Sequence, residues 1–307
     1  MPWLIVAVCS YFLLAVVALV DKYLLGRALV SPKMYAFYVG VGGIFVLIFI
    51  PFGFFLPEPS IIIFALLAGI FHILGIFITF KAIQLFEVSR VVPAIGGFLP
   101  LFVFGLTYIF PVEKEMFSQF EILSFFLLIL GSVIITWERS KTVSFKSLKM
   151  AALAAFLLAF FFVLAKFVYL SQPFINGLIW TRIGAFLAAV VFLFTKEVRE
   201  ELFEKREALK MKTLGILIPN QAVAAGAFLL QNWAVALVPL TSLAFVNALE
   251  GTRYVFLLIF AVFLSLSRPL WAKKTGLKED ISRKVILQKI IALLLIGGGL
   301  ILLAFNP

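Results

Sequence analysis

Charged side chains are scarce in this chain and make up only 13% of its 307 residues. Soluble domains carry about 25% charged residues and about 45–50% apolar residues. Here 64% of the residues are hydrophobic, and the mean hydropathy is +1.17. This composition argues against a soluble globular fold and indicates a protein that crosses a membrane several times.

Cysteine and histidine are almost absent, because Cys9 and His72 are the only residues of their kinds. A single cysteine excludes an internal disulfide, and a lone histidine without a neighbouring Cys, Asp or Glu argues against a metal site. The sequence also lacks the HExxH and GxSxG patterns of hydrolases and the GxxxxGK[ST] loop that binds nucleotide phosphates. We therefore expect no metal, no cofactor, no enzymatic activity and no direct use of ATP.

Long apolar runs fill most of the sequence. A membrane-crossing helix needs about 20 consecutive apolar residues, whereas a membrane barrel shows alternating segments of about 10 residues. The runs predict an all-α membrane protein with ten transmembrane helices, the first of which we expect to be retained and not removed as a signal peptide. The charged connector 196–212 predicts an additional helix at the membrane surface. The ten spans are predicted near 3–25, 34–56, 60–81, 89–110, 119–137, 147–170, 174–195, 213–237, 241–264 and 286–304.

Basic residues are distributed unevenly between the connectors. Of the 26 Lys and Arg residues, 22 lie in connectors that follow odd-numbered spans, and only Lys114 lies on the opposite side. Cytoplasmic loops of membrane proteins are rich in Lys and Arg, so the basic connectors are predicted in the cytoplasm and both termini outside the cell membrane. The net charge of +11 then indicates contact with membrane lipids and not with nucleic acid.

The chain is predicted to contain two copies of one five-span unit, in residues 1–140 and 147–307. Pro32 and Pro173 are each followed eleven residues later by a glycine, at Gly43 and Gly184. The segments 82–94 and 234–246 also align without a gap. An odd number of spans per copy places the two copies in opposite orientations, which is an architecture of transporters that alternate access to a central site.

These segments also carry a resemblance to a known family. The pattern Lys166-x6-Pro173-x8-Arg182 resembles the start of an EamA repeat. The run 82–101, the residues Pro111-Val112-Glu113 and a span containing Gly131 resemble its second part. Nearly the whole chain is thus similar to the EamA-type branch of the drug/metabolite transporter superfamily. The resemblance implies ten helices and a central cavity for export of small metabolites.

Arg182 is the strongest candidate for substrate binding, because it lies eight residues inside the seventh span. A charged residue within a membrane span is costly and is expected to face the bundle interior or a wet cavity. There it would bind an anionic group of the substrate, such as a carboxylate. The alternative is a contact that stabilises the fold, with helix-end carbonyls or an acidic partner.

Two lysines and one ion pair are further candidates. Lys166 is predicted either in the substrate site or at the interface, reached by snorkelling, and its repeat mate Lys22 either at a gate or in a local ion pair. Glu250 and Arg253 are three residues apart on one helix face. Arg253 is predicted as a structural partner, and Glu250 either as part of that pair or as a group that takes up a proton during transport.

Uncharged polar residues and prolines complete the candidate set. His72, Asn232 and Asn247 lie within spans, where they would bond to the polar part of a substrate or to another helix. His72 is also a candidate to carry protons. Pro93 and Pro100 interrupt the hydrogen-bond ladder of the fourth span, so they are structural or gating candidates.

These observations predict a secondary transporter that exports a small polar or amphipathic metabolite, such as an amino acid, by alternating access. Protons are the expected coupling ion. Two alternatives remain at this stage, namely a flippase for lipids or lipid-linked sugars and a membrane scaffold or sensor that moves no solute.

The predicted sidedness has a direct test. An epitope tag fused at Pro307 should be accessible from outside intact cells, because the basic connectors hold the opposite ends of the spans in the cytoplasm. A tag that antibody reaches only after the cells are permeabilised would contradict this orientation.

Overall fold

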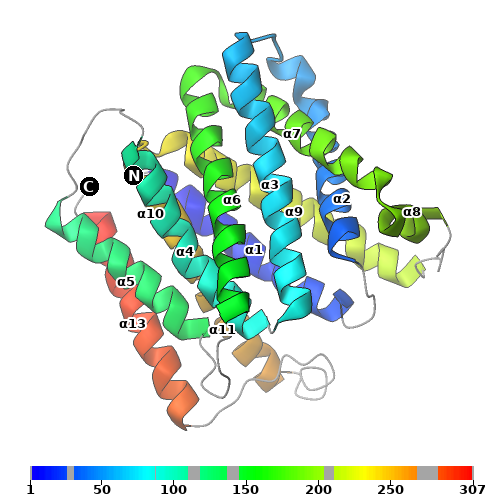
Figure 1. The fold of residues 1–307 in the computed structure, drawn as a ribbon. Helices are drawn as coiled ribbons and strands as arrows, with labels where there is room; N and C mark the ends of the chain where they lie inside the picture. The colour runs from blue at the N-terminus through cyan, green and yellow to red at the C-terminus, as the bar shows by residue number, and fades with distance from the viewer. Residues whose placement is uncertain are drawn as a thin grey trace.

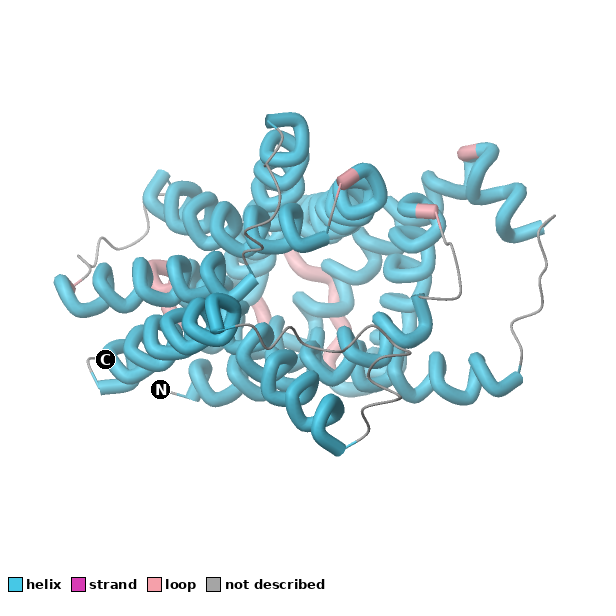
Figure 2. The backbone as a smooth tube through the Cα atoms, turned by 90° about the horizontal axis from the view of Figure 1, so that it is seen from below, coloured by secondary structure: helices cyan, strands magenta, loops and turns pink. Residues whose placement is uncertain are grey.

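The computed structural model describes residues 2–25, 31–86, 88–109, 118–136, 145–203, 211–267 and 283–305. Within these ranges every regular element is a helix, and no strand is present (Figure 2). The helices are α1 (Pro2–Leu25), α2 (Pro32–Gly42), η1 (Gly43–Phe52), α3 (Pro59–Leu85), α4 (Val88–Ile109), α5 (Gln119–Thr136), α6 (Phe145–Ser171), α7 (Phe174–Val191), η2 (Phe192–Phe194), α8 (Lys196–Phe203), α9 (Met211–Leu237), α10 (Leu243–Ala248), α11 (Glu250–Ser267) and α13 (Arg283–Phe305).

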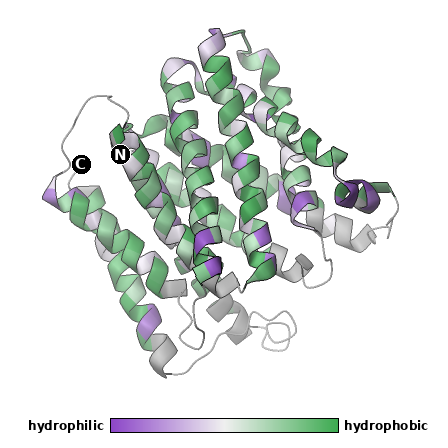
Figure 3. Ribbon diagram, viewed as in Figure 1, coloured by the Kyte–Doolittle hydropathy of each residue, from purple (hydrophilic) through white to green (hydrophobic). Residues whose placement is uncertain are grey.

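Apolar helices of membrane length dominate the structure (Figure 3). Six helical segments of the described chain are long and apolar enough to cross a bilayer. Three shorter apolar helices, at Ala94–Thr107, Gln119–Ile134 and Leu287–Leu303, accompany them. The prediction of an all-α, multi-pass membrane protein is therefore confirmed.

Most predicted spans begin and end within a few residues of a helix, but two contain irregularities that the sequence analysis missed. The second span changes from α-helix to a ten-residue 3₁₀ helix at Gly43 and ends at Gly53, where φ is 134°. The ninth span is interrupted at Leu249, whose carbonyl accepts a hydrogen bond from the Thr252 N–H at 2.9 Å in place of the usual α-helical partner. The predicted surface helix is present as α8, while residues 204–210 lie outside the described ranges.

The helices pack through small residues. Helix α3 lies against α6 and α7, α1 lies against α9, and α5 lies against α13 (Figure 1). Gly69 of α3 meets the α7 backbone at Thr181 and Ala185, so no side chain fits between these two helices. At the α5–α13 contact the Ser124 hydroxyl donates to the Gly299 carbonyl at 2.9 Å. Close backbone approach of this kind is how helices associate where lipid supplies no hydrophobic driving force.

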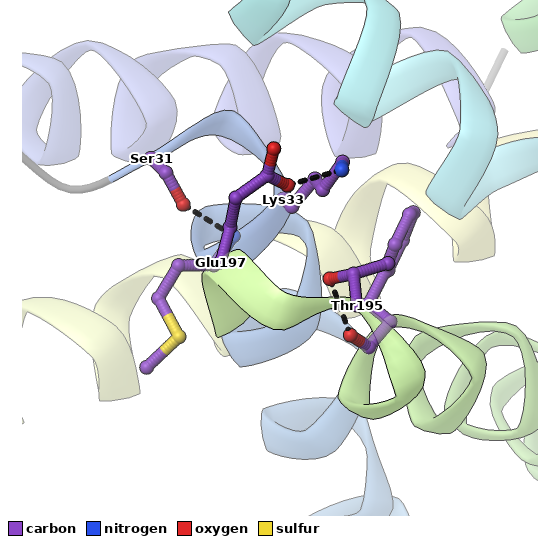
Figure 4. A network of polar contacts seen from close by, with 6 residues as sticks. Ser31, Lys33, Thr195 and Glu197 are labelled. Carbon is purple, nitrogen blue, oxygen red and sulfur yellow. Dashed lines mark hydrogen bonds and ion pairs between the residues drawn. The ribbon is translucent and has the colours of Figure 1, made fainter. Parts of the chain in front are cut away.

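The start of α1 and the end of α13 lie at one end of the bundle, which we call the upper end from its place in Figure 1. Helices α3 and α11 end at the opposite, lower end, where α6 and α13 begin. Figure 4 shows polar contacts where α2 and α8 begin. Ser31 caps α2 by accepting a hydrogen bond from the Met34 N–H at 3.2 Å, and Lys33 forms an ion pair with Glu197 of α8.

A methyl group at Gly69 should therefore destabilise the bundle. We expect Gly69→Ala to lower the free energy of unfolding by about 1–3 kcal/mol, because the new Cβ overlaps the α7 backbone. Thermal unfolding in detergent micelles measures the effect. Gly226→Ala is the matched control, since a Cβ there meets nothing within 4 Å. Equal melting temperatures for the two variants would contradict the packing described here.

Candidate functional site

Arg182 lies in the middle of α7 and is buried, with 7% of its surface exposed. The carbon of its guanidinium group lies 3.4 Å from the centre of the Phe228 ring on α9. Gly43 provides space on the other side, because a Cβ at that position would lie 3.1 Å from the Arg182 Cδ. The arginine is thus held between α9 and the start of η1 as a flat cation stacked on an aromatic face.

The guanidinium has no hydrogen-bond acceptor or carboxylate partner among the described residues. Arginine carries five N–H donors, and each donor left without an acceptor in a buried place costs free energy. A planar cation with free donors is the group that binds a carboxylate or phosphate in a bidentate manner. The structure thus shows neither a carbonyl nor an acidic partner for Arg182 among the described residues, and its role in substrate binding stays a prediction.

His72 of α3 and Arg182 contact the same phenylalanine. The His72 ring lies 4.5 Å from the Phe161 ring and 5.3 Å from the Phe228 ring, measured between centroids. His72 is 7% exposed and lies close enough to Arg182 for the two side chains to interact electrostatically. The structure therefore brings together two candidates that are 110 positions apart in the sequence.

Asn232 belongs to the same group through Tyr169. The Tyr169 hydroxyl of α6 donates to the Asn232 Oδ1 at 2.9 Å, and the Asn232 amide donates to the Phe228 carbonyl at 3.0 Å. Tyr169 also lies near enough to Arg182 for the two to interact electrostatically. We call Arg182, His72, Tyr169, Phe228 and Asn232 the arginine cluster.

Lys166 lies one turn before Tyr169 but makes a different contact. It is 1% exposed, and its Nζ donates to the Ala236 carbonyl at 2.9 Å. Ala236 belongs to the last turn of α9, where carbonyls lack partners within the helix and attract cations. This contact indicates a structural role for Lys166, while its predicted places in the substrate site or at the interface stay predictions.

Asn247, Glu250 and Arg253 gather at the break between α10 and α11. Glu250 and Arg253 form the predicted ion pair, with 3.7 Å between Oε1 and Nη1. Asn247 is 1% exposed, and its Oδ1 has no partner among the described residues. Tyr11 of α1 and Tyr254 lie near enough to interact with Glu250. We call this second group the junction cluster.

Helix α9 separates the two clusters. Asn232 contributes to the arginine cluster, while the adjacent Gln231 donates to the Tyr11 hydroxyl at 3.4 Å. The sequence analysis treated its candidates as one site, and the structure divides them into two. The side chains of Lys22 and Pro93 lie outside the described residues, and Pro100 is buried in α4.

Four aromatic residues of these clusters were missed, namely Tyr11, Tyr169, Phe228 and Tyr254. The signal for the tyrosines was present in the composition, because the chain has only 7 Tyr against 37 Phe. A tyrosine within a span of such a chain adds a hydroxyl that needs a partner, and this marks it as a polar site. No comparable signal distinguishes Phe228 from the other phenylalanines.

An apolar cavity of about 400 Å³, open to the surface, lies at the upper end beside the arginine cluster. Phe52, Phe55 and Trp233 in its lining are exposed. Its lining residues come from the segment after η1, the α6–α7 turn and α9, and they are Phe52, Gly53, Phe55, Pro173, Phe174, Ile175 and Trp233. The Phe174 ring contacts both Tyr169 of the arginine cluster, at 5.2 Å, and Trp233 of the cavity, at 4.7 Å. One ring thus separates the cavity from the cluster.

Comparisons with known proteins inform the fold alone. No protein-family model and no curated protein matches the chain. Solved structures do match, and one described as "Crystal structure of protein" aligns with a TM-score of 0.68 at 15% identity. The alignment covers 100% of this chain and 99% of that one. The whole bundle therefore has a fold already seen in another protein.

A structural role for Lys166 makes a prediction. Lys166→Met should lower the free energy of unfolding by about 1–3 kcal/mol, because the Ala236 carbonyl loses its donor. The affinity of the folded variant for its substrate should stay unchanged. Thermal unfolding and ligand-induced stabilisation of the same sample measure the two effects. Weaker ligand binding at unchanged stability would instead place Lys166 in the substrate site.

Proposed function

We propose that the protein is a secondary transporter that exports a small polar or amphipathic metabolite bearing an anionic group, by alternating access. The observation that supports this most is the Arg182 guanidinium, which lies buried without an acceptor among the described residues. A carboxylate of an amino acid or organic acid would accept its donors in the bidentate geometry that arginine favours.

The cost of placing Arg182 in the membrane supports a functional role. Arginine at the centre of a membrane helix costs about 2.5–3.5 kcal/mol on insertion scales. Phe228 offsets part of this cost through its ring face but accepts none of the N–H groups. A structural arginine would be expected to meet carbonyls or a carboxylate, as Lys166 does at Ala236. An arginine whose N–H donors have no acceptor in the described part of the protein is better suited to a ligand that binds and dissociates.

The helix packing supports two inverted five-helix repeats, of the EamA type, in residues 1–140 and 147–307. Two such repeats would match α1 with α6 and α3 with α9. The α1–α9 contact in one pairing then corresponds to the α6–α3 contact in the other, and the structure has both contacts. The α5–α13 contact would lie on the symmetry axis and map onto itself. In such transporters one half rocks against the other around a central site. We place the basic lower end in the cytoplasm.

The junction cluster supports proton coupling as part of the proposal. Among the described residues, Glu250 is within reach of one internal cation, Arg253, and of two tyrosine hydroxyls. Protonation of the carboxylate would release Arg253 from its ion pair and change the contacts at the α10–α11 break. His72 contacts the arginine cluster directly and is the second group that could exchange protons.

Solute exchange in proteoliposomes tests the proposal. Vesicles holding purified protein are loaded with amino acids, nucleosides and organic acids, and each solute is followed by mass spectrometry with and without a pH gradient. We expect loss of one anionic or zwitterionic class, accelerated when the same solute is outside. Retention of every solute by folded protein would overturn the proposal.

Arg182 variants then test the site. Arg182→Gln should reduce exchange of the anionic substrate by about 10- to 100-fold, because a hydrogen-bonded charge contributes about 1.5–3 kcal/mol. Arg182→Lys should recover only part of the activity, since an ammonium group cannot bind in a bidentate manner or stack as flatly. Lys149→Gln is the control, because Lys149 is exposed. Undiminished exchange by folded Arg182→Gln would remove Arg182 from the site.

The coupling role of Glu250 is tested by Glu250→Gln in the same vesicles. The amide keeps the size of the side chain but cannot take up a proton. We expect exchange to continue and acceleration by the pH gradient to disappear. A gradient effect equal to that of the unmodified protein would exclude Glu250 from proton coupling.

A further inference from the structure

Two polar contacts connect the halves of the chain at opposite ends of α7. At the upper end, the segment after η1 is attached to α7. The Phe55 N–H donates to the Asn176 Oδ1 at 3.1 Å, and the Trp180 indole N–H donates to the Phe55 carbonyl at 3.2 Å. The Phe54 ring stacks on Trp180 with 5.6 Å between centroids. We call this set of contacts the upper latch.

At the other end of α7, on the right in Figure 1, α8 is attached to the start of α2. The Lys33 ammonium group donates to the Glu197 carboxylate, as Figure 4 shows. Beneath this ion pair lies a small apolar cluster formed by Met34 and Phe37 of α2, Ala189 of α7 and Val198 of α8. We call the Lys33–Glu197 contact the lower latch.

The two latches occupy matching places in the two halves. Pro32 and Pro173 are 141 positions apart, and so are Gly43 and Gly184. The same spacing matches Glu197 with Leu56, beside Phe55, and matches Lys33 with Phe174, two residues before Asn176. In the upper latch, the segment that follows η1 contacts the start of α7. In the lower latch, helix α8, which follows α7 and η2, contacts the start of α2.

We propose that the upper and lower latches are the two gates of the transporter, each closing one end over the central site, and that they open alternately. This inference rests on the proposed function of alternating access. The upper latch lies between the open apolar cavity and the buried core of α7, next to the arginine cluster that Phe174 borders. Opening it would separate the segment after η1 from α7, and opening the lower latch would separate α8 from α2.

The latches differ in chemistry, and this predicts different behaviour. The upper latch consists of one hydrogen bond to Asn176, which is 0% exposed, a second bond from the Trp180 indole to the Phe55 carbonyl, and a stacked ring pair, so it contains no charged group. The lower latch is an ion pair whose side chains are 30% and 60% exposed. Salt screens exposed ion pairs strongly and hydrogen bonds between uncharged groups weakly. The lower gate should therefore open more readily and respond to ionic strength.

Cysteine labelling measures each gate without any substrate. In a Cys9→Ala background, Leu178→Cys reports on the part of α7 behind the upper latch, and Val198→Cys reports on the cluster beneath the lower latch. Leu178 is 2% exposed and Val198 is 0% exposed, so labelling of either position by a maleimide requires opening. Because no transport is needed, the result is readable even if the protein moves none of the solutes tested above.

Each latch is then weakened separately. Trp180→Phe keeps the stacking ring but removes one donor, and Asn176→Ala removes the other contact. Loss of such a hydrogen bond should speed labelling of Leu178→Cys about tenfold and slow labelling of Val198→Cys. Glu197→Lys should speed labelling of Val198→Cys by about two- to fivefold and slow labelling of Leu178→Cys. Its control is Glu200→Lys, which breaks the Lys196–Glu200 pair within α8 and should change neither rate.

Salt provides a test that needs no latch substitution. Raising ionic strength from about 0.05 M to 1 M shortens the screening length to about 3 Å, so labelling of Val198→Cys should rise and labelling of Leu178→Cys should not. The proposal is overturned if weakening either latch speeds labelling at both ends, since the latches would then only hold the bundle together. It is also overturned if Glu200→Lys matches Glu197→Lys, or if salt leaves Val198→Cys unchanged.

Discussion

Every polar group inside this bundle must find its partner within the protein, because the surrounding hydrocarbon offers no hydrogen bonds. The structure meets this constraint through hydrogen bonds from side chains to the backbone carbonyls of other helices. Ser10 donates to the Ala227 carbonyl, Tyr11 to the Val246 carbonyl and Lys166 to the Ala236 carbonyl. Each of these bonds joins two helices that are far apart in the sequence, so satisfying a polar group also fixes a helix pair.

Against this background, the few polar atoms without partners become informative. In the described chain the unsatisfied buried side-chain atoms include Asn247 Oδ1, Arg253 Nε and the Tyr254 hydroxyl, all near the α10–α11 break. The Arg182 guanidinium, stacked on the Phe228 ring, also has no hydrogen bond to a described residue. A folded protein rarely leaves such groups unpaired without a reason. Three of the four unsatisfied buried atoms of the described chain lie in the junction cluster, and the fourth, Gln172 Nε2, lies just after α6.

The spans could be read from the sequence because lipid imposes a minimum apolar length, and Pro32, Pro59 and Pro173 mark where α2, α3 and α7 begin. Arg182 and His72 could be nominated because charge and imidazole are rare inside spans. Their partners could not be predicted in the same way. Phe228 is one of 37 phenylalanines, and its place beside Arg182 depends on how α7 and α9 pack. The division of the candidates into two clusters likewise depends on which face of α9 Gln231 and Asn232 occupy.

The 3₁₀ helix η1 gives the second span an unusual mechanical property. A 3₁₀ helix rises about 2.0 Å per residue and an α-helix about 1.5 Å, so ten residues are about 5 Å longer in the first form. Long 3₁₀ segments are uncommon because their hydrogen bonds are poorly aligned. Rewinding η1 into an α-helix would shorten the rod between Gly43, beside Arg182, and Phe52, next to the segment that holds Phe55. A change between the two helix types would thus move Phe52 relative to Arg182 by several ångströms, so that this one span has two available lengths.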